Sequence, residues 1–309
     1  MTVPSRPRDR PQLITRPPPT RYTVGLMIDD FIGDCEELSY PLWRVAGEDT
    51  VRLGKERHHV PVLAEVDVTE ARAAMARRKR QGDQAVSFTA WAAKCVAQAA
   101  SEQRRVHALR DRRGFGRRRR LIVFADVDMS VAVYRRLAGD DAGERLPMPF
   151  VLRKVNERSL EQVSDEMRLA QARPLSQDQQ WLDPDTGTPP PWPARLGLAP
   201  PRRLRARLSW DRLLGDPFRV KKTMGTVMLT SVPLTSRSGG GAWGIPAGIH
   251  PLIVALGAIG RRPGMVDDRV EARDMLSMTV LIDHDVVDGV PMALFLRRLN
   301  ELRETAFGL

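Results

Sequence analysis

The sequence is poor in cysteine: Cys35 and Cys95 are the only two among 309 residues. Two cysteines this far apart form neither a Cys-x-x-Cys pair nor the four-ligand set of a structural zinc site, so the sequence predicts no metal. Cys95 falls on the apolar face of a predicted helix, which favours a buried free thiol. Cys35 lies in an acidic stretch and carries no functional signal.

Long apolar runs are also lacking. No segment approaches the roughly 20 consecutive apolar residues that span a bilayer, and residues 1–22 have no apolar core of the kind found in secretory signals. These absences predict a cytoplasmic protein without a membrane segment. The sequence also has none of the Gly-x-Ser-x-Gly, P-loop or His-Glu-x-x-His patterns of hydrolases, NTPases and metalloproteases.

Positive charge is what the sequence has in excess: 49 Lys and Arg stand against 38 Asp and Glu, a formal net charge of +11. The excess is concentrated in residues 1–22, 104–120 and 202–207. Nucleic-acid-binding proteins interleave aromatic residues with such charge, whereas aromatics are only 6% of this chain and residues 104–120 have the pattern of an exposed hairpin. We therefore expect no nucleic-acid partner, and the basic residues favour a polyphosphate ligand.

Composition divides the chain into parts. Residues 1–22 are a Pro/Arg-rich arm that is predicted to lack regular structure. Residues 23–54 are expected to form an extension that packs on the core. Residues 55–309 are the predicted α/β domain, and within it residues 173–218, rich in Pro, Asp, Gly and Arg, are expected to be an irregular insertion.

Several segments of the domain have the alternation or the apolar character of strands. They are residues 59–68, 121–133, 226–232, 252–259 and 276–284. A glycine-rich loop lies between the third and the fourth segment. Because helical patterns are interspersed with these strands, the sequence predicts one mixed α/β domain.

Four helices are expected from periodicity and capping residues. Thr69 and Ser87 are predicted caps, Ser159 and Gln162 match a capping box, and Pro291 suits the first turn of the last helix. The first of these helices is expected to run to Arg80. The helix after Ser87 has an apolar face formed by Phe88, Trp91, Ala92, Cys95, Val96 and Ala99. The last helix is expected to bury Met292, Phe295, Leu299 and Leu302.

The strongest chemical signal lies at the end of the strand predicted at 276–284. Alternation places His284 on the apolar face of this strand, and Asp288 and Gly289 follow in a turn. An imidazole in a partly dry environment suits a general base, because its pKa lies near neutrality. Taken alone, a histidine at a strand end is more often structural. Asp288 is expected to hold the loop around His284 rather than to move protons.

The pattern H-x-x-x-D-G at residues 284–289, followed by a helix with Phe-Leu-x-x-Leu, resembles the active-site signature of 2-oxoacid dehydrogenase E2 acyltransferases and chloramphenicol acetyltransferases. The order of other segments makes the resemblance more specific. They read HVPVLAEVDVTEARA, VFADVDMSVAV, LPMPFVLRKVNERSLEQVSDEMRLA, GTVMLTSV and IHPLIVALGAIGRRP. The resemblance covers about residues 55–309 and is weakest over 173–218.

The resemblance implies a two-layer α/β sandwich, with a mixed and mostly antiparallel sheet and packed helices, assembled as a homotrimer with active sites between subunits. It implies that His284 removes the proton from the thiol of coenzyme A or of a dihydrolipoyl group, which then attacks an acyl thioester. Thr230 would donate a hydrogen bond to the oxyanion and would face His284 of the next chain. Ser231 and Gly289 are assigned to substrate binding. If the register slips by one, Ser231 replaces Thr230, because the two lie on opposite faces.

Two features depart from the E2 pattern. E2 enzymes typically have an Arg after the histidine, where this chain has Asp285, although chloramphenicol acetyltransferases lack that Arg too. The N-terminal region is too short and too rich in Pro and Arg for a lipoyl domain, so any lipoyl group is expected from another chain. Partners then include a lipoyl-carrying protein or other dehydrogenase components, and further assembly into a cage is left open. Two alternatives also remain: a catalytically weak scaffold protein, and a small-molecule O/N-acetyltransferase.

Other candidate motifs are weaker. The Gly-x-Gly-x-x-Gly pattern at residues 239–244 is followed by IPAGIHP rather than by a helix, which argues against a dinucleotide site. His58 and His59 precede a strand and His250 precedes a proline, with no metal-ligand partner in sequence. We interpret all three as surface or core histidines.

Overall fold

The computed structural model describes residues 42–113, 120–136, 145–173, 202–231 and 240–309. The chain divides into a unit of residues 1–44 and a unit of residues 45–309. The predicted arm at 1–22 and Cys35 lie outside the described residues. The extension predicted at 23–54 is described only from residue 42 onward, as the helix α1 (Leu42–Lys55).

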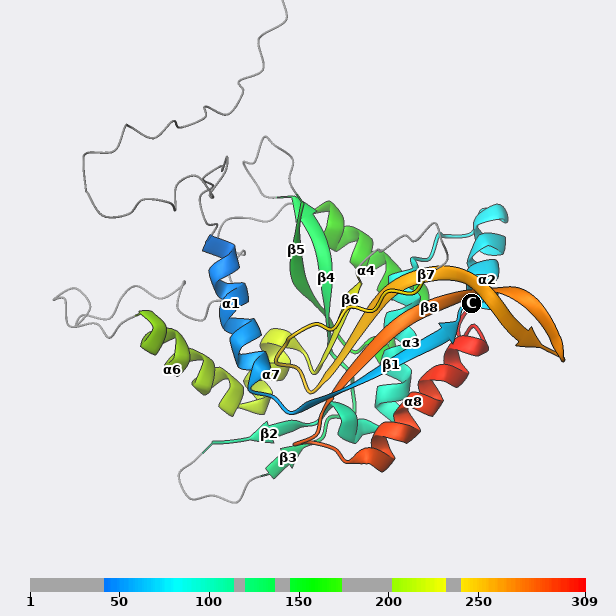
Figure 1. Cartoon of the computed structure of the whole chain (residues 1–309). Coiled ribbons are helices and arrows are strands. Elements are labelled where there is room, and N and C mark those ends of the chain that lie inside the picture. The colour runs from blue at the N-terminus through cyan, green and yellow to red at the C-terminus, as the bar shows by residue number, and fades with distance from the viewer. Residues whose placement is uncertain (1–41, 114–119, 137–144, 174–201, 232–239) are drawn as a thin grey trace, which may run out of the picture. The chain divides into compact units, whose positions relative to one another are not determined.

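A six-stranded sheet organises the larger unit, in the order β1-β8-β7-β6-β4-β5 (Figure 1). Its strands are β1 (His59–Asp67), β4 (Met129–Arg136), β5 (Arg145–Leu152), β6 (Val227–Ser231), β7 (Leu252–Val266) and β8 (Arg269–Asp283). β8 is antiparallel to β1 and β7, and β4 is antiparallel to β5, whereas β6 is parallel to both of its neighbours. The predicted mixed, mostly antiparallel sheet is confirmed.

Helices pack on this sheet to form the second layer (Figure 1). They are α2 (Thr69–Arg80), α3 (Phe88–Glu102), α4 (Leu160–Ala172) and α8 (Gly289–Glu304). α3 lies between α4 and α8 and contacts both, while α4 packs on β4 and α8 on β1. The apolar faces predicted for α3 and α8 are confirmed, since all their named residues except the half-buried Phe88 are buried. The predicted two-layer sandwich is therefore confirmed.

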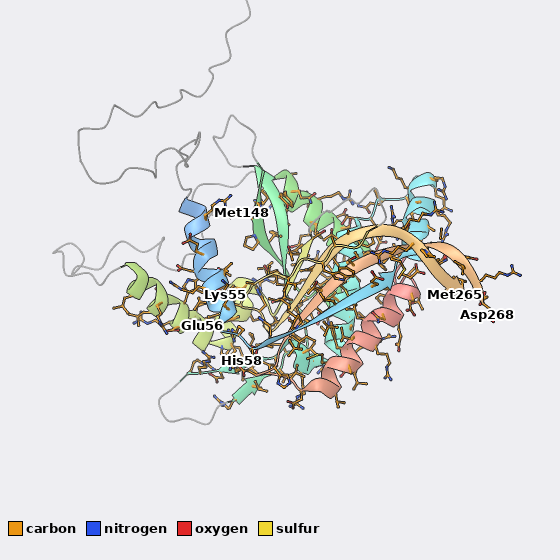
Figure 2. All side chains as sticks on the ribbon, viewed as in Figure 1. Lys55, Glu56, His58, Met148, Met265 and Asp268 are labelled. Carbon is orange, nitrogen blue, oxygen red and sulfur yellow. The ribbon has the colours of Figure 1, made fainter. Side chains whose placement is uncertain are left out.

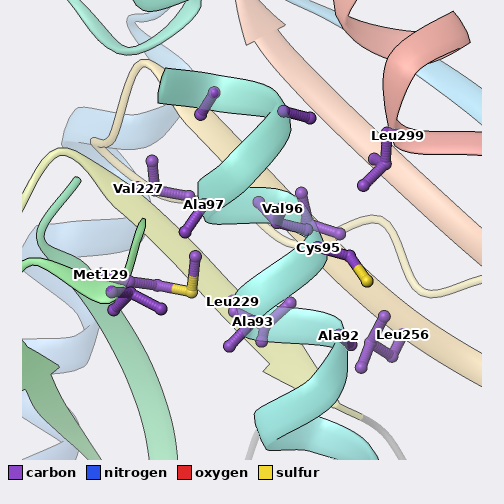
Figure 3. Packing of buried hydrophobic residues seen from close by; sticks show 14 of the residues in the cluster. Ala92, Ala93, Cys95, Val96, Ala97, Met129, Val227, Leu229, Leu256 and Leu299 are labelled. Atoms are coloured by element: carbon purple, nitrogen blue, oxygen red, sulfur yellow. The ribbon is translucent and has the colours of Figure 1, made fainter. Parts of the chain in front are cut away.

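Small side chains let α3 approach the sheet closely. Figure 3 shows Ala93 and Ala97 beside Met129 of β4 and Leu229 of β6, and these four residues are fully buried. Cys95, on the same helix, is a buried free thiol, as predicted. Burial raises the pKa of this thiol to about 12, because a thiolate would lose its hydration there.

Two of the three predicted helix caps are confirmed. The Ser87 hydroxyl accepts a hydrogen bond from Ala90 N at 3.0 Å, and Ser159 and Gln162 form a full capping box. The prediction for Thr69 is wrong, because the N-cap position of α2 is Val68, which makes no side-chain cap. The Thr69 hydroxyl instead accepts from the backbone N–H of Asp274 in β8 at 2.8 Å. It therefore ties α2 to the sheet.

The strand predicted at 121–133 is wrong as a single element. Residues 120–122 form β3 (Arg120–Ile122), which pairs with β2 (Leu109–Asp111) in a separate two-stranded sheet, and β4 begins only at Met129. The chain bends between them. Lys221 Nζ lies 2.8 Å from both Asp126 and Asp128 in this bend, and the carbonyl of Asp128 accepts a hydrogen bond from Thr226 N at 2.8 Å.

The prediction that residues 173–218 form an irregular insertion is wrong for residues 202–218, which the structure describes. Residues 202–215 form α6 (Arg202–Gly215), and α7 (Pro217–Met224) follows with Asp216 as its cap. Arg and Leu are good helix formers, and neither proline nor glycine occurs within α6 before its last residue. The buried Trp210 of α6 joins Leu53, Met224 and Ile249 in a second small core. Residues 174–201 lie outside the described residues.

The segment after the glycine-rich loop runs along the sheet without forming a helix. Ala258 N donates to the Ala242 carbonyl at 3.1 Å, and Trp243 Nε1 donates to the Ala64 carbonyl at 3.3 Å. Gly257 is required here, because a Cβ on it would overlap the Ala242 carbonyl oxygen. As expected, the glycine pattern at 239–244 does not open a helix in its described part, residues 240–250.

Arg303 of α8 is a buried cation without a partner in the described part of the chain. Its side chain is among the largest that are fully buried, and no described residue bonds to its three guanidinium nitrogens. Burial lowers the pKa of this group to about 10. Holding an unpaired charge in the core is costly.

We therefore expect Arg303→Met to raise the free energy of unfolding by about 2 kcal/mol, since Met fills a similar volume without the charge. Urea unfolding at pH 8 measures the change. Arg298→Met is the matched control, because it removes a half-exposed guanidinium from the same helix and its 2.7 Å ion pair with Glu102. It should cost less than about 1 kcal/mol. A destabilised Arg303→Met variant would contradict the prediction.

Candidate active site

The predicted base, His284, lies immediately after a deeply buried strand. β8 ends at Asp283 rather than at residue 284, and eight consecutive residues, 276–283, are buried before the exposed His284. The loop that follows leads directly into α8, which begins at Gly289. His284 N donates to the carbonyl of His58 at 2.9 Å, so the backbone of the histidine is fixed to the start of β1. The imidazole is thus exposed on a backbone that the sheet holds.

Asp283 anchors this loop from inside. Its carboxylate is fully buried and lies 3.4 Å from Arg57 and 4.0 Å from Arg110. The same carboxylate accepts a hydrogen bond from Asp285 N at 3.1 Å, while Asp283 N donates to the Pro251 carbonyl at 2.8 Å. Arg57 is itself largely buried, and this burial lowers the pKa of its guanidinium. The loop is therefore held by a buried ion pair and by backbone bonds on both sides.

Asp285, the departure from the E2 pattern, has partners of its own. One carboxylate oxygen lies 2.9 Å from His58 Nδ1, and the other lies 2.6 Å from an Arg110 nitrogen. The hydrogen bond with His58 and the charge of Arg110 lower the pKa of this carboxyl. Arg110 belongs to β2, in the small sheet. A cation from another element therefore lies beside the position where E2 enzymes carry their Arg.

The backbones of His58 and His284 lie opposite each other, beyond the paired ends of β1 and β8. The β1–β8 register pairs His59 with Asp283, and the bond from His284 N to His58 O continues that register by one residue. Directly opposed residues share a face and have Cβ atoms about 5 Å apart. Figure 2 shows His58 at the end of β1, far from Met265 and Asp268 at the tip of the β7–β8 hairpin. His58 and His284 are therefore backbone neighbours at this end of the sheet.

The other histidines of the motif survey have structural partners. His59 Nε2 donates to the His250 carbonyl at 2.8 Å, and the buried His250 donates from its own Nε2 to the Met224 carbonyl at 3.0 Å. The interpretation of surface or core histidines is confirmed for these two. The side chain of His58 is 75% exposed, as a surface histidine would be, but its place beside His284 was not predicted.

Asp288 and Gly289 both lie at the exposed start of α8. Asp288 occupies the N-cap position, but its side chain makes no capping hydrogen bond within the described ranges. Gly289 has open space where a Cβ would be. Within one chain the loop is held by Asp283 and Asp285. A holding role for Asp288 stays a prediction.

Thr230 and His284 are not brought together within one chain. Both Thr230 and Ser231 are half-buried residues of β6, and Thr230 pairs with Ala255, which pairs with Thr279. Two strand spacings of about 4.8 Å and five residues of about 3.3 Å then separate Thr230 from His284, which gives about 19 Å.

Thr230 points away from the core beneath the helices. Val227 and Leu229, which alternate with it along β6, point into that core. His284 lies in the loop after β8 and is exposed.

Metal-binding and membrane-spanning features were also sought in the described part of the chain. Among those residues, no group of three or more His, Cys, Asp or Glu side chains is placed to hold a metal ion. None of the described helices is long and apolar enough to cross a membrane.

Comparison with known proteins finds a family match for the segment that contains the His284 loop. Residues 250–306 match the model of the family "2-oxoacid dehydrogenases acyltransferase (catalytic domain)". This segment contains β7, β8, the loop with His284 and α8. This segment of the chain is therefore similar to an acyltransferase catalytic domain. The resemblance predicted from sequence is thereby confirmed for residues 250–306, and no curated protein matches the sequence.

Solved structures show that the chain shares its fold with dihydrolipoamide acetyltransferases and a 2-oxoacid dehydrogenase core. A probable dihydrolipoamide acetyltransferase from Listeria monocytogenes 4b F2365 is 22% identical, with a TM-score of 0.58 over 89% of this chain and 96% of that one. The dihydrolipoamide acetyltransferase of Azotobacter vinelandii is 18% identical, with a TM-score of 0.59 over 94% and 97%. A truncated 2-oxoacid dehydrogenase core from Thermoplasma acidophilum is 18% identical, with a TM-score of 0.56 over 88% and 99%.

Proposed function

We propose that this chain is an acyltransferase that moves an acyl group between coenzyme A and a thiol such as dihydrolipoamide, with His284 as the general base. One observation carries the proposal: an exposed imidazole follows eight buried residues at the end of β8, on a loop fixed by the buried Asp283. A general base needs this combination of access to substrate and a fixed backbone. The loop also lies inside the segment that matches the acyltransferase family.

In the proposed reaction, His284 takes the proton of the attacking thiol. The thiolate forms a bond to the carbonyl carbon of the acyl thioester, and the carbonyl oxygen becomes an oxyanion. The Thr230 hydroxyl donates a hydrogen bond to this oxyanion, with Ser231 as the alternative donor. When the intermediate collapses, the original carbon–sulfur bond breaks, and the leaving thiolate receives the proton from the His284 imidazolium. Ser231 and Gly289 remain assigned to substrate binding in this proposal.

We propose that the complete site lies between subunits of a homotrimer. The separation of about 19 Å between Thr230 and His284 within one chain supports this, because no side chain spans it. In the Azotobacter vinelandii enzyme, a serine, a histidine and an asparagine four residues after the histidine were investigated for their role in catalysis. Here Asp288 follows His284 at the same spacing. By analogy, Thr230 takes the place of the serine.

The remaining parts of the proposal concern context. Residues 55–309 form the catalytic domain. Some of the excess Lys and Arg side chains bind the phosphates of coenzyme A. A lipoyl group is supplied by another chain in the cytoplasm. A related fold is the cubic core of the pyruvate dehydrogenase multienzyme complex, which supports assembly of trimers into a larger particle with dehydrogenase components. No metal takes part in the proposed chemistry.

The direct test is acyl transfer from acetyl-CoA and several longer acyl-CoAs to dihydrolipoamide, measured with the full chain. Turnover above the uncatalysed rate supports the proposal. A folded oligomer without turnover on any of these pairs would overturn the thiol-acceptor function. Activity with hydroxyl or amine acceptors would then favour a small-molecule acetyltransferase, and inactivity with all acceptors would favour a scaffold.

Co-expression of two inactive variants tests the site between subunits. Thr230→Val is expected to lower turnover about a hundredfold, because the oxyanion loses a donor. When it is mixed with a chain carrying His284→Gln, about a quarter of the sites in a random trimer combine an intact Thr230 with an intact His284. Turnover of the mixture should therefore rise to about a quarter of the wild-type value. Activity no higher than that of the separate variants would place both residues of a site in one chain.

A further inference from the structure

We propose that His58, Asp285 and Arg110, here called the His58 cluster, position the His284 loop and set how readily His284 takes up a proton. This inference rests on the proposed role of His284 as the base. The cluster joins three elements that are distant in sequence: the residue before β1, the loop after β8, and the middle of β2. None of its members belongs to the His284–Asp288–Gly289 pattern.

Each member of the cluster is linked to His284 directly or through Asp285. The His58 carbonyl accepts a hydrogen bond from His284 N at 2.9 Å, and Asp285 is the next residue in the chain. Asp285 bridges His58 Nδ1 at 2.9 Å and Arg110 at 2.6 Å with its two oxygens. Since an ionised carboxylate only accepts hydrogen bonds, His58 donates to Asp285 through Nδ1–H, and its side chain is 75% exposed.

Charged side chains from several elements meet around Arg57 and Asp283, at the end of the sheet that holds the His284 backbone. The cations are Arg57, Arg110 and Arg112, the carboxylates are Asp283 and Asp285, and Asp288 lies at the start of α8. Arg57 neutralises Asp283 in the interior, which leaves the partly exposed ion pair of Asp285 with Arg110 as the charged pair on the loop that carries His284. The nearest charges decide the protonation of an imidazole.

Single substitutions in the cluster therefore have opposite expected effects. Asp285→Asn removes a negative charge and leaves Arg110 unneutralised, so protonation of His284 becomes harder and its titration midpoint falls. Arg110→Gln leaves Asp285 unneutralised, so the midpoint rises. Each shift is expected to be about half a unit to one unit, because the groups are close but partly exposed. A network that only stabilises the fold would not shift the midpoint in opposite directions.

Histidine NMR of the full chain measures these midpoints without requiring activity. The chain has five histidines, so ¹³C labelling of the imidazoles gives few signals. Burial lowers the pKa of His107 and His250 to about 4, and these two therefore stay neutral over the upper pH range in which an ordinary imidazole titrates. The signals of His58, His59 and His284 are assigned with His58→Gln, His59→Gln and His284→Gln.

Asp274→Asn is the matched control. Asp274 lies on the same strand, at the opposite end of the β1–β8 pairing, and makes an exposed 2.7 Å ion pair with Arg72. Its removal is expected to leave the His284 midpoint unchanged. The acid limb of the pH profile of kcat/KM should follow the same order as the NMR midpoints, with a downward shift for Asp285→Asn and an upward shift for Arg110→Gln.

The outcomes separate this inference from the proposed function. If the two variants shift the His284 midpoint in opposite directions but the protein shows no acyl transfer, the inference about the His58 cluster is supported and the proposed function is rejected. If acyl transfer depends on His284 but the midpoint stays fixed or moves in the same direction in both variants, the inference about the His58 cluster is rejected. The proposed function is then supported.

Discussion

Replacing His284 with glutamine is expected to lower acyl transfer by a factor of about 10² to 10⁴, the range that general bases contribute. Glutamine preserves the approximate size and polarity of the side chain but cannot accept the proton of a thiol. Because His284 is exposed and its fixed contact is made by its backbone, the stability of the fold should change by no more than about 0.5 kcal/mol. The loss should appear in kcat as well as in kcat/KM.

The measurement compares initial rates of acyl transfer to dihydrolipoamide, with urea unfolding as a check on folding. His59→Gln is the control, because it removes a neighbouring histidine while its amide can still donate to the His250 carbonyl. Its rate should remain within about threefold of the wild-type rate. A His284→Gln variant with rates near the wild type would exclude His284 as the base.

Acid is expected to destabilise the protein by about 6 kcal/mol between about pH 7 and pH 4, through two buried histidines. His107 donates from Nδ1 to the Thr226 hydroxyl at 3.0 Å, and His250 donates from Nε2 to the Met224 carbonyl at 3.0 Å. The second ring nitrogen of each is buried without a partner among the described residues. Burial lowers the pKa of each imidazole from 6.5 to about 4, because a proton there would add an uncompensated buried charge.

The direction of the effect follows from these values. In the unfolded chain both histidines bind protons near pH 6.5, whereas in the folded chain they do so only near pH 4. Their contribution is fully present above about pH 6.5 and is lost as the pH falls toward about 4, at about 3 kcal/mol for each histidine. At still lower pH, carboxylates such as Asp128, whose pKa its hydrogen bond with Lys221 helps to lower, weaken the fold further.

Urea unfolding from about pH 8 to about pH 4.5 measures this dependence. His107→Asn and His250→Gln each preserve a hydrogen-bond donor in place of the imidazole N–H and remove the titrating group. Each variant should flatten the fall in unfolding free energy by about half between about pH 6.5 and pH 4.5. An unchanged slope in both variants would mean that other groups take up the protons.

Local structure was well predicted from the sequence. The α3 and α4 caps, the apolar face of α8 and the strand leading to His284 depend on neighbours within a few residues, so their patterns are visible in the chain. Thr69 shows the limit of this reasoning. A threonine before a helix matches a cap, but its hydroxyl is used by β8, some 200 residues away, and no local pattern encodes that contact.

The candidate site was predicted only in part for the same reason. His284, Asp288 and Gly289 stand together in one motif, whereas Arg57, His58 and Arg110 reach the site through tertiary contacts. His58 could have been found only from the register of β1 against β8, which the sequence does not specify by itself. Arg110 was one of many arginines in a basic segment, and the ion pair with Asp285 that distinguishes it joins β2 of the small sheet to the loop after the large one.

The pairing of β1 with β8 also constrains when the site can form. The contacts from Arg57 to Asp283 and from His58 to Asp285 join residues 226 and 227 positions apart. Closing so large a loop is slow compared with forming the β7–β8 hairpin, whose contacts are local. During synthesis, β1 leaves the ribosome long before β8 has been made, so the backbone groups of β1 that pair with β8 stay unpaired until then. We therefore expect β1, which fixes the loop that carries His284, to pair with β8 late in folding. Catalytic activity would then appear only when the whole sheet has formed.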